Sequence, residues 1–109
     1  MKISLNMWLK NKYQKITRGF TDEEIWNLDN TIAKWLLPRL KYLKENTCGY
    51  PPDLKTFEEW QDILQKMINA FELYNSDSNK FNLNQLKTEQ EIIEEGIHLF
   101  GKYFGYLWW

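Results

Sequence analysis

Two segments of this chain start with the same helix-initiation signal, and this feature constrains the fold most. Thr21 precedes Glu24 by three residues, as Thr56 precedes Glu59, which is the spacing of a capping box. The apolar residues that follow recur every three or four positions, as on one face of an α-helix. They are Ile25, Leu28, Ile32, Trp35, Leu36, Leu40 and Leu43 after the first signal, and Trp60, Leu64, Met67, Ile68, Phe71 and Tyr74 after the second. The sequence therefore predicts two amphipathic helices.

The rest of the chain completes an all-α prediction. A third apolar face predicts a last helix from about residue 85 to 103, and the Asn-rich residues 75–84 predict a surface loop. Residues 1–17 fit an N-terminal arm or a short helix. We therefore expect a small bundle of three to four helices over residues 18–109. The last helix contains three glycines that would allow another helix to approach closely, namely Gly96, Gly101 and Gly105.

The first predicted helix is long, about residues 22–45, with a kink at Pro38 because proline removes one backbone hydrogen bond. Its apolar arc is roughly 200° wide, more than one packing surface needs, so the helix is central or lies at a subunit interface. Asp29 falls inside this arc. A buried carboxylate needs a partner, either a backbone N–H or Arg18, or alternatively a donor on a ligand.

The two arginines flank this helix, against twelve lysines in the chain. Arg18 lies at its start, and Arg39 falls inside the apolar arc. Arginine binds carboxylate or phosphate through paired hydrogen bonds and stacks on aromatic rings. They either fix the ends of the helix to Asp29 or glutamate side chains or hold an anionic ligand.

Six tryptophans are more than a core of this size requires. Trp60 is expected in the core, and Trp108 on the last helical face against the bundle. Trp26 and Trp35 are nine residues apart and point to opposite sides of a continuous helix, so one of them meets a ligand or a neighbouring subunit. We predict a subunit interface through three residues, namely Trp26, Leu37 and Trp109. Tyr50 lies on a Gly-Tyr-Pro-Pro turn that is either a helix stop or a contact surface.

Composition excludes several classes of function. The net charge of −1 provides no field to attract long nucleic acid, and no run approaches the ~20 apolar residues of a membrane span. A single cysteine, Cys48, forms no intrachain disulfide and favours a reducing cytosol, and no signal peptide is expected. One histidine and one cysteine support neither a metal site nor a nucleophile pair. We therefore expect a non-enzymatic protein with no cofactor.

Four parts of the chain carry a distinctive pattern. They are Arg18-Gly19-Phe20-Thr21-Asp22-Glu23-Glu24-Ile25-Trp26-Asn27-Leu28-Asp29 continuing as Ala33-Lys34-Trp35 and Pro38-Arg39-Leu40-Lys41, then Gly49-Tyr50-Pro51, Glu59-Trp60 with Lys66-Met67, and Leu99-Phe100-Gly101-Lys102-Tyr103-Phe104 with Leu107-Trp108. In this pattern the chain resembles a group of small helical proteins of phages and prophages, over roughly residues 16–109. The resemblance implies a phage setting and a helical fold, and it transfers no catalytic residue.

In that setting we expect an accessory protein that counteracts host anti-phage immunity in the cytoplasm of the infected cell. The first hypothesis is a sponge, a homo-oligomer that sequesters a nucleotide second messenger such as a cyclic nucleotide or an ADP-ribose-type signal. Arg18 and Arg39 would bind phosphate, Trp26 or Trp35 would stack on a base, and Asp29 would accept from a base or ribose. Tyr50 is also predicted among the ligand-binding residues. The alternative is an anti-CRISPR-like inhibitor that binds a host defence effector or nuclease through Trp and Tyr side chains on an exposed face.

Overall fold

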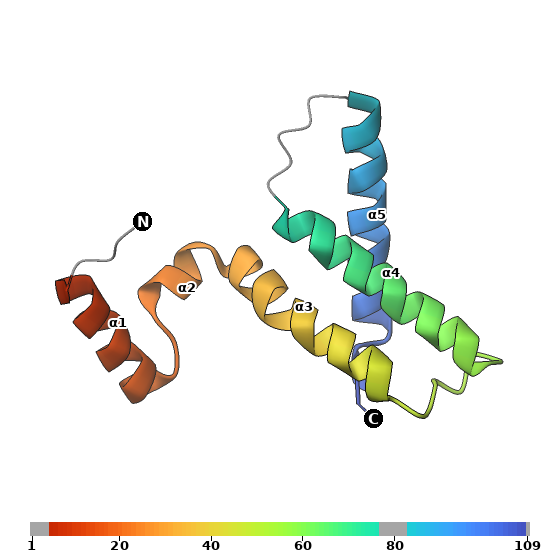
Figure 1. Ribbon diagram of the computed structural model, residues 1–109, viewed down its shortest axis with the longest axis horizontal. Coiled ribbons are helices and arrows are strands. Elements are labelled where there is room, and N and C mark those ends of the chain that lie inside the picture. Colours follow the sequence, from red (N-terminus) through yellow and green to blue (C-terminus); the bar gives the residue numbers. More distant parts are fainter. Residues whose placement is uncertain (1–4, 77–82, 109) are drawn as a thin grey trace. The chain divides into compact units, whose positions relative to one another are not determined.

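The computed structural model describes residues 5–76 and 83–108, with the backbone alone for 83–87, and every regular element within them is helical (Figure 1). The elements are α1 (Leu5–Arg18), α2 (Asp22–Trp26), α3 (Leu28–Asn46), α4 (Phe57–Asn75), α5 (Leu83–Lys102) and the 3₁₀ turn η1 (Phe104–Tyr106). The predicted all-α class is confirmed. The chain divides into two compact units, residues 1–32 and residues 33–109.

In the first unit, the helix-start signal at Thr21 forms as predicted. The Thr21 N–H donates to Glu24 Oε2 at 2.9 Å, and the Glu24 N–H donates to Thr21 Oγ1 at 3.3 Å. The helix ends early, because Asn27 adopts φ −129° and ψ 55°, outside the helical region. The segment predicted as one kinked helix over 22–45 is therefore two helices, with the interruption at Asn27. Pro38 lies inside α3 and does not end it.

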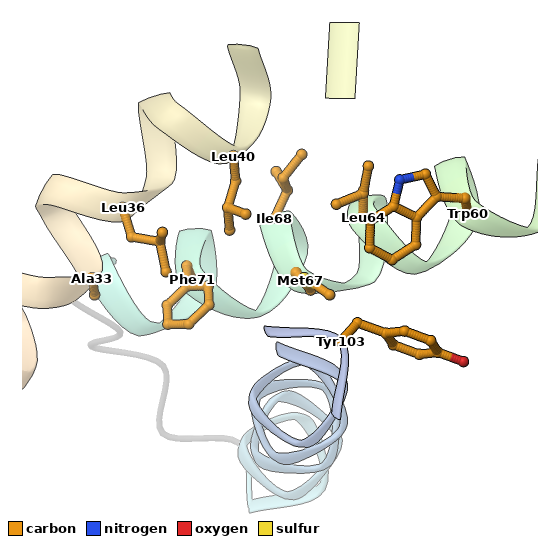
Figure 2. Packing of buried hydrophobic residues seen from close by; sticks show 9 residues of the cluster. All are labelled: Ala33, Leu36, Leu40, Trp60, Leu64, Met67, Ile68, Phe71 and Tyr103. Carbon is orange, nitrogen blue, oxygen red and sulfur yellow. The ribbon is translucent and has the colours of Figure 1, made fainter. Parts of the chain in front are cut away.

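The second unit contains the hydrophobic core (Figure 2). Trp60 is 1% exposed and meets the Tyr103 ring edge-on at 5.6 Å between centroids, as its place in the predicted stripe requires. Figure 2 shows Leu36 and Leu40 pointing from α3 toward α4. The buried cluster comes from α3, from α4 and from the residue after α5: Ala33, Leu36, Leu40, Trp60, Leu64, Met67, Ile68, Phe71 and Tyr103.

The approach of α5 to α4 depends on Gly96. A Cβ placed on Gly96 would lie 2.2 Å from the Ala70 Cβ and 2.8 Å from the Lys66 carbonyl oxygen. This confirms that a glycine of the last helix permits close helix packing. The same expectation is wrong for Gly101 and Gly105, where a Cβ would meet nothing within 4 Å.

Polar contacts fix the loop that joins α3 to α4. Thr56 Oγ1 accepts from the Glu59 N–H at 3.2 Å. The Glu59 carboxylate accepts from the Lys55 N–H at 3.0 Å and not from the Thr56 N–H, so the second capping box is only half formed. The Tyr103 hydroxyl donates to Asp53 at 3.0 Å. Burial, and then this hydrogen bond, raise the pKa of Tyr103.

Two expectations fall on residues outside the described ones. They are the centre of the Asn-rich loop, residues 77–82, and the interface role of Trp109. Over residues 5–76 and 83–108, no helix has both the length and the apolar character needed to cross a membrane.

Candidate functional site

An open groove of about 520 Å³ lies on the second unit, between α3 and the C-terminal segment. Its base includes the core residues Leu36 and Leu40, so it is aliphatic. Trp35 and Trp108 also line the groove, and they are 58% and 71% exposed. We call this the Trp35 groove and define it by its lining: Trp35, Leu36, Pro38, Arg39, Leu40, Tyr42, Leu43, Leu107 and Trp108.

The local sequence explains how Arg39 is held. Pro38 has no N–H, so the helical hydrogen-bond ladder is interrupted in this turn of α3. Arg39 Nη1 donates to the Trp35 carbonyl at 2.7 Å, and its guanidinium carbon lies 4.0 Å from the centroid of the Trp35 ring. Such a stack is favourable for a cation over an indole face and restricts the long arginine side chain.

Arg39 is the one charged residue in the lining of the Trp35 groove. Within the part of the chain that the structure describes, it forms no ion pair. The exposed cations Lys41 and Lys66, in contrast, pair with Glu72 and Glu95 at 2.9 and 3.1 Å. The groove therefore combines an apolar surface with one positive charge that has no carboxylate partner in the described structure.

A smaller hollow of about 150 Å³ adjoins the groove, because Trp108 lines both. Tyr50 lies here, on the turn that carries Gly49 and Pro51, and is exposed. The remaining lining residues are Cys48, Trp60 and Tyr106. Tyr50 thus lines a surface hollow and lies on the turn that follows the end of α3.

The predicted ligand-binding residues divide between the two units. The structure brings Trp35 and Arg39 into contact and places Tyr50 in the adjoining hollow. Arg18, Trp26 and Asp29 belong to the first unit, where no described hollow contains them. Leu37, predicted at an interface, is half-buried and packs against the core.

Arg18 serves to connect α1 to the start of α2. Its guanidinium donates to the Asp22 carboxylate and to the Phe20 carbonyl, and Gln14 Nε2 also donates to Asp22, at 2.8 Å. These hydrogen bonds, first that of Arg18 and then that of Gln14, lower the pKa of Asp22 to about 2. The sequence allowed a structural role for Arg18, with Asp29 or a glutamate as its partner. Arg18 has that structural role, but its partner is Asp22.

Two expectations about burial are wrong. Asp29 is exposed in the first turn of α3, where free backbone N–H groups favour a carboxylate. Asp29 shares a face of α3 with the buried Ala33, four residues later, but the hydrophobic core begins only at Ala33, so Asp29 stays exposed. Trp108 is exposed because α5 ends at Lys102 and the chain continues through η1.

Of the nine lining residues, the sequence predicts only Trp35 and Arg39 as site residues. The missed residues include Tyr42, Leu107 and Trp108. For Tyr42 a signal existed, because it lies three residues after Arg39 and seven after Trp35, on the same face of a helix. For Leu107 and Trp108 no helical spacing applies beyond the end of α5.

Among the described residues, no group of three or more His, Cys, Asp or Glu side chains is placed to hold a metal ion. Comparison of the chain with protein-family models, with curated proteins and with solved structures finds no match. Inference about function therefore depends on the chemistry of the Trp35 groove.

Proposed function

We propose that this chain is a non-catalytic binding protein that contacts a partner protein through the Trp35 groove. The observation that carries the proposal is the gathering of Trp35, Trp108 and Arg39 around one apolar groove. In the phage setting that the resemblance implies, the partner is a host defence effector or nuclease, and binding blocks it.

The residue types in the groove support a protein partner. Trp, Tyr and Arg are the side chains that most often dominate the free energy of protein–protein binding, particularly beside a surface that can exclude water. Exposed aromatic rings over an aliphatic base lose little conformational entropy on binding and bury much apolar area. The Trp35 side chain is also restricted before a partner binds, because Arg39 is stacked on its ring.

A nucleotide signal has less support as the ligand. Phosphate recognition would draw on Arg18 and Arg39, but Arg18 is engaged by Asp22 and the Phe20 carbonyl. The groove offers Arg39 as its one lining charge, whereas a messenger with two or more phosphates favours several cations. The volume of the groove does not discriminate, because pockets of 300–1,000 Å³ also suit small molecules.

Affinity capture tests the proposal. The tagged chain and its Trp35→Ala variant are incubated with lysate of the host bacterium, and bound proteins are identified and quantified. We expect one partner in stoichiometric amount with the unmodified chain and its loss with Trp35→Ala. Trp26→Ala is the matched control, because Trp26 is an exposed tryptophan of α2 that does not line the groove.

Two results would count against a protein partner. One is capture that Trp35→Ala and Trp26→Ala reduce equally, or not at all. The other is calorimetric binding of a cyclic oligonucleotide or an ADP-ribose-type compound to the purified chain, lost with Arg39→Gln. The second result would establish the sponge function in its place.

Self-association is a second part of the proposal, carried by α1. Three apolar residues, Leu5, Leu9 and Ile16, share one face of this helix and are exposed. The opposite, polar side of α1 is the one that contacts α2, through Gln14 and Arg18. We expect light scattering to give more than the monomer mass, and Leu9→Gln to return the monomer. A monomer at micromolar concentration would contradict this part.

A further inference from the structure

We infer that the Trp35 groove takes an acidic amphipathic helix of the partner, with a carboxylate between two apolar side chains. This inference rests on the proposed function, because it names the chemistry of the partner at the same groove. It makes Arg39 the residue that decides which segments bind, whereas Trp35 provides a general apolar contact.

The apolar part of the match comes from the spacing along α3. Trp35 and Tyr42 are seven residues apart, which is two helical turns or about 10 Å along the axis. Both line the groove above its aliphatic base of Leu36 and Leu40. A helix that lies along α3 would meet these rings with apolar residues at positions i and i+7, the usual arrangement of a helix bound in a groove.

The charged part of the match comes from Arg39, which lies between those two rings in sequence and on the same face. One of its five N–H donors is used by the Trp35 carbonyl, at 2.7 Å. The guanidinium forms no ion pair within the described residues, and no carboxylate lines the groove. A carboxylate at position i+3 or i+4 of the bound helix would accept from two of its four remaining donors.

Charge complementarity therefore determines the sign of the charge on the partner's side chain at this position. A basic residue at the same position would place two cations together beside an apolar surface, where water screens them poorly. The stack of Arg39 on Trp35 already holds the guanidinium at the groove, so a carboxylate binds it without ordering a free side chain.

A peptide selection tests the inference with the full chain. A yeast-displayed library of random peptides is selected on the unmodified protein, and enriched peptides are counter-screened on Trp35→Ala. We expect the Trp35-dependent peptides to carry Asp or Glu three or four positions from an apolar residue. Replacing that acid by its amide in the peptide should weaken binding by about tenfold on the unmodified chain.

Variants of α3 isolate the role of Arg39. On Arg39→Gln, the acid-to-amide change in the peptide should have almost no effect. On Lys34→Gln it should keep the full effect, because Lys34 is an exposed cation of the same helix that does not line the groove. Both substituted side chains are exposed, so we expect each variant to fold, and denaturant unfolding is the measurement that checks this.

The outcomes separate the inference from the proposed function. The inference of an acidic partner is refuted if the Trp35-dependent peptides show no preference for an acid. It is also refuted if they show one that Arg39→Gln leaves intact. In both cases the groove remains a protein-binding site. If no enriched peptide depends on Trp35, both the groove as a protein-binding site and its acidic partner are refuted.

Discussion

Replacing Gly96 by alanine tests the close contact between α5 and α4. The added Cβ would lie 2.2 Å from the Ala70 Cβ and 2.8 Å from the Lys66 carbonyl oxygen. Neither neighbour is the end of a flexible side chain, so α4 and α5 must move apart to admit the methyl group. We expect Gly96→Ala to destabilise the second unit, although alanine favours a helix more than glycine does.

The magnitude follows from two opposing contributions. Overpacking of a tight contact costs about 1–3 kcal/mol, and a Cβ–Cβ separation of 2.2 Å places this contact at the upper end. The gain in helix propensity offsets about 1 kcal/mol of that cost. The free energy of unfolding should therefore fall by about 2 kcal/mol, which lowers the melting temperature by about 8–16 °C in a unit of this size.

Gly101→Ala is the matched control, because Gly101 lies in the same helix and a Cβ there meets nothing within 4 Å. It should leave stability unchanged or raise it by up to about 1 kcal/mol. Urea unfolding followed by Trp fluorescence measures both variants, since Trp60 lies in the core of this unit.

Ala70→Gly completes a double-mutant cycle with Gly96→Ala. It removes the nearer clashing atom and leaves the Lys66 carbonyl contact. The double variant should be more stable than the sum of the single effects by about 1 kcal/mol. The packing argument is refuted if Gly96→Ala unfolds at the same urea concentration as Gly101→Ala, or if the cycle shows no coupling.

Three further perturbations test local contacts. Arg18→Gln should move the pKa of Asp22 from about 2 toward 3.8, as followed by NMR of its carboxyl carbon. Because the pKa of Asp22 is lowered in the folded state, this contact stabilises the first unit above pH 3.8, and the stabilisation is lost as the pH falls through 2. An unchanged titration of Asp22 in the variant would exclude Arg18 as the cause of the lowered pKa. Tyr103→Phe removes the hydrogen bond to Asp53 and should cost about 1 kcal/mol in urea unfolding, with no loss contradicting the contact. Thr56→Ala removes the N-cap acceptor of α4 and should also cost about 1 kcal/mol, and equal hydrogen exchange in the first turn of α4 would refute that role.

Local signals in the sequence predict the helices well. The capping box at Thr21 and the stripe through Trp60 are short-range patterns, and each specifies its helix without knowledge of the rest of the chain. Gly96 was also identified as a position of close approach. Its contact with Ala70 and Lys66 of α4 is a tertiary one, which local patterns do not encode.

The errors concern where helices end and where the core begins. No glycine or proline marks Asn27, so the sequence predicts one continuous helix where the structure has two. Asp29 shares a face of α3 with the buried Ala33, but the spacing of apolar residues does not show that the core begins only at Ala33. The end of α5 at Lys102 similarly removed the basis for burying Trp108. The Trp35 groove could be predicted only in part, because Trp35 and Arg39 share one helix whereas Leu107 and Trp108 reach it by tertiary packing.

The most direct measurement of the central claim is the affinity of the captured partner for the purified chain, by calorimetry, with Trp35→Ala compared with Trp26→Ala. Trp35 is 58% exposed and lies outside the buried core, so its removal should leave folding intact while binding weakens. A central tryptophan contact contributes about 2 kcal/mol or more, which predicts roughly a 30-fold loss of affinity for Trp35→Ala. Affinity unchanged within twofold, with both variants folded, would contradict binding through the Trp35 groove.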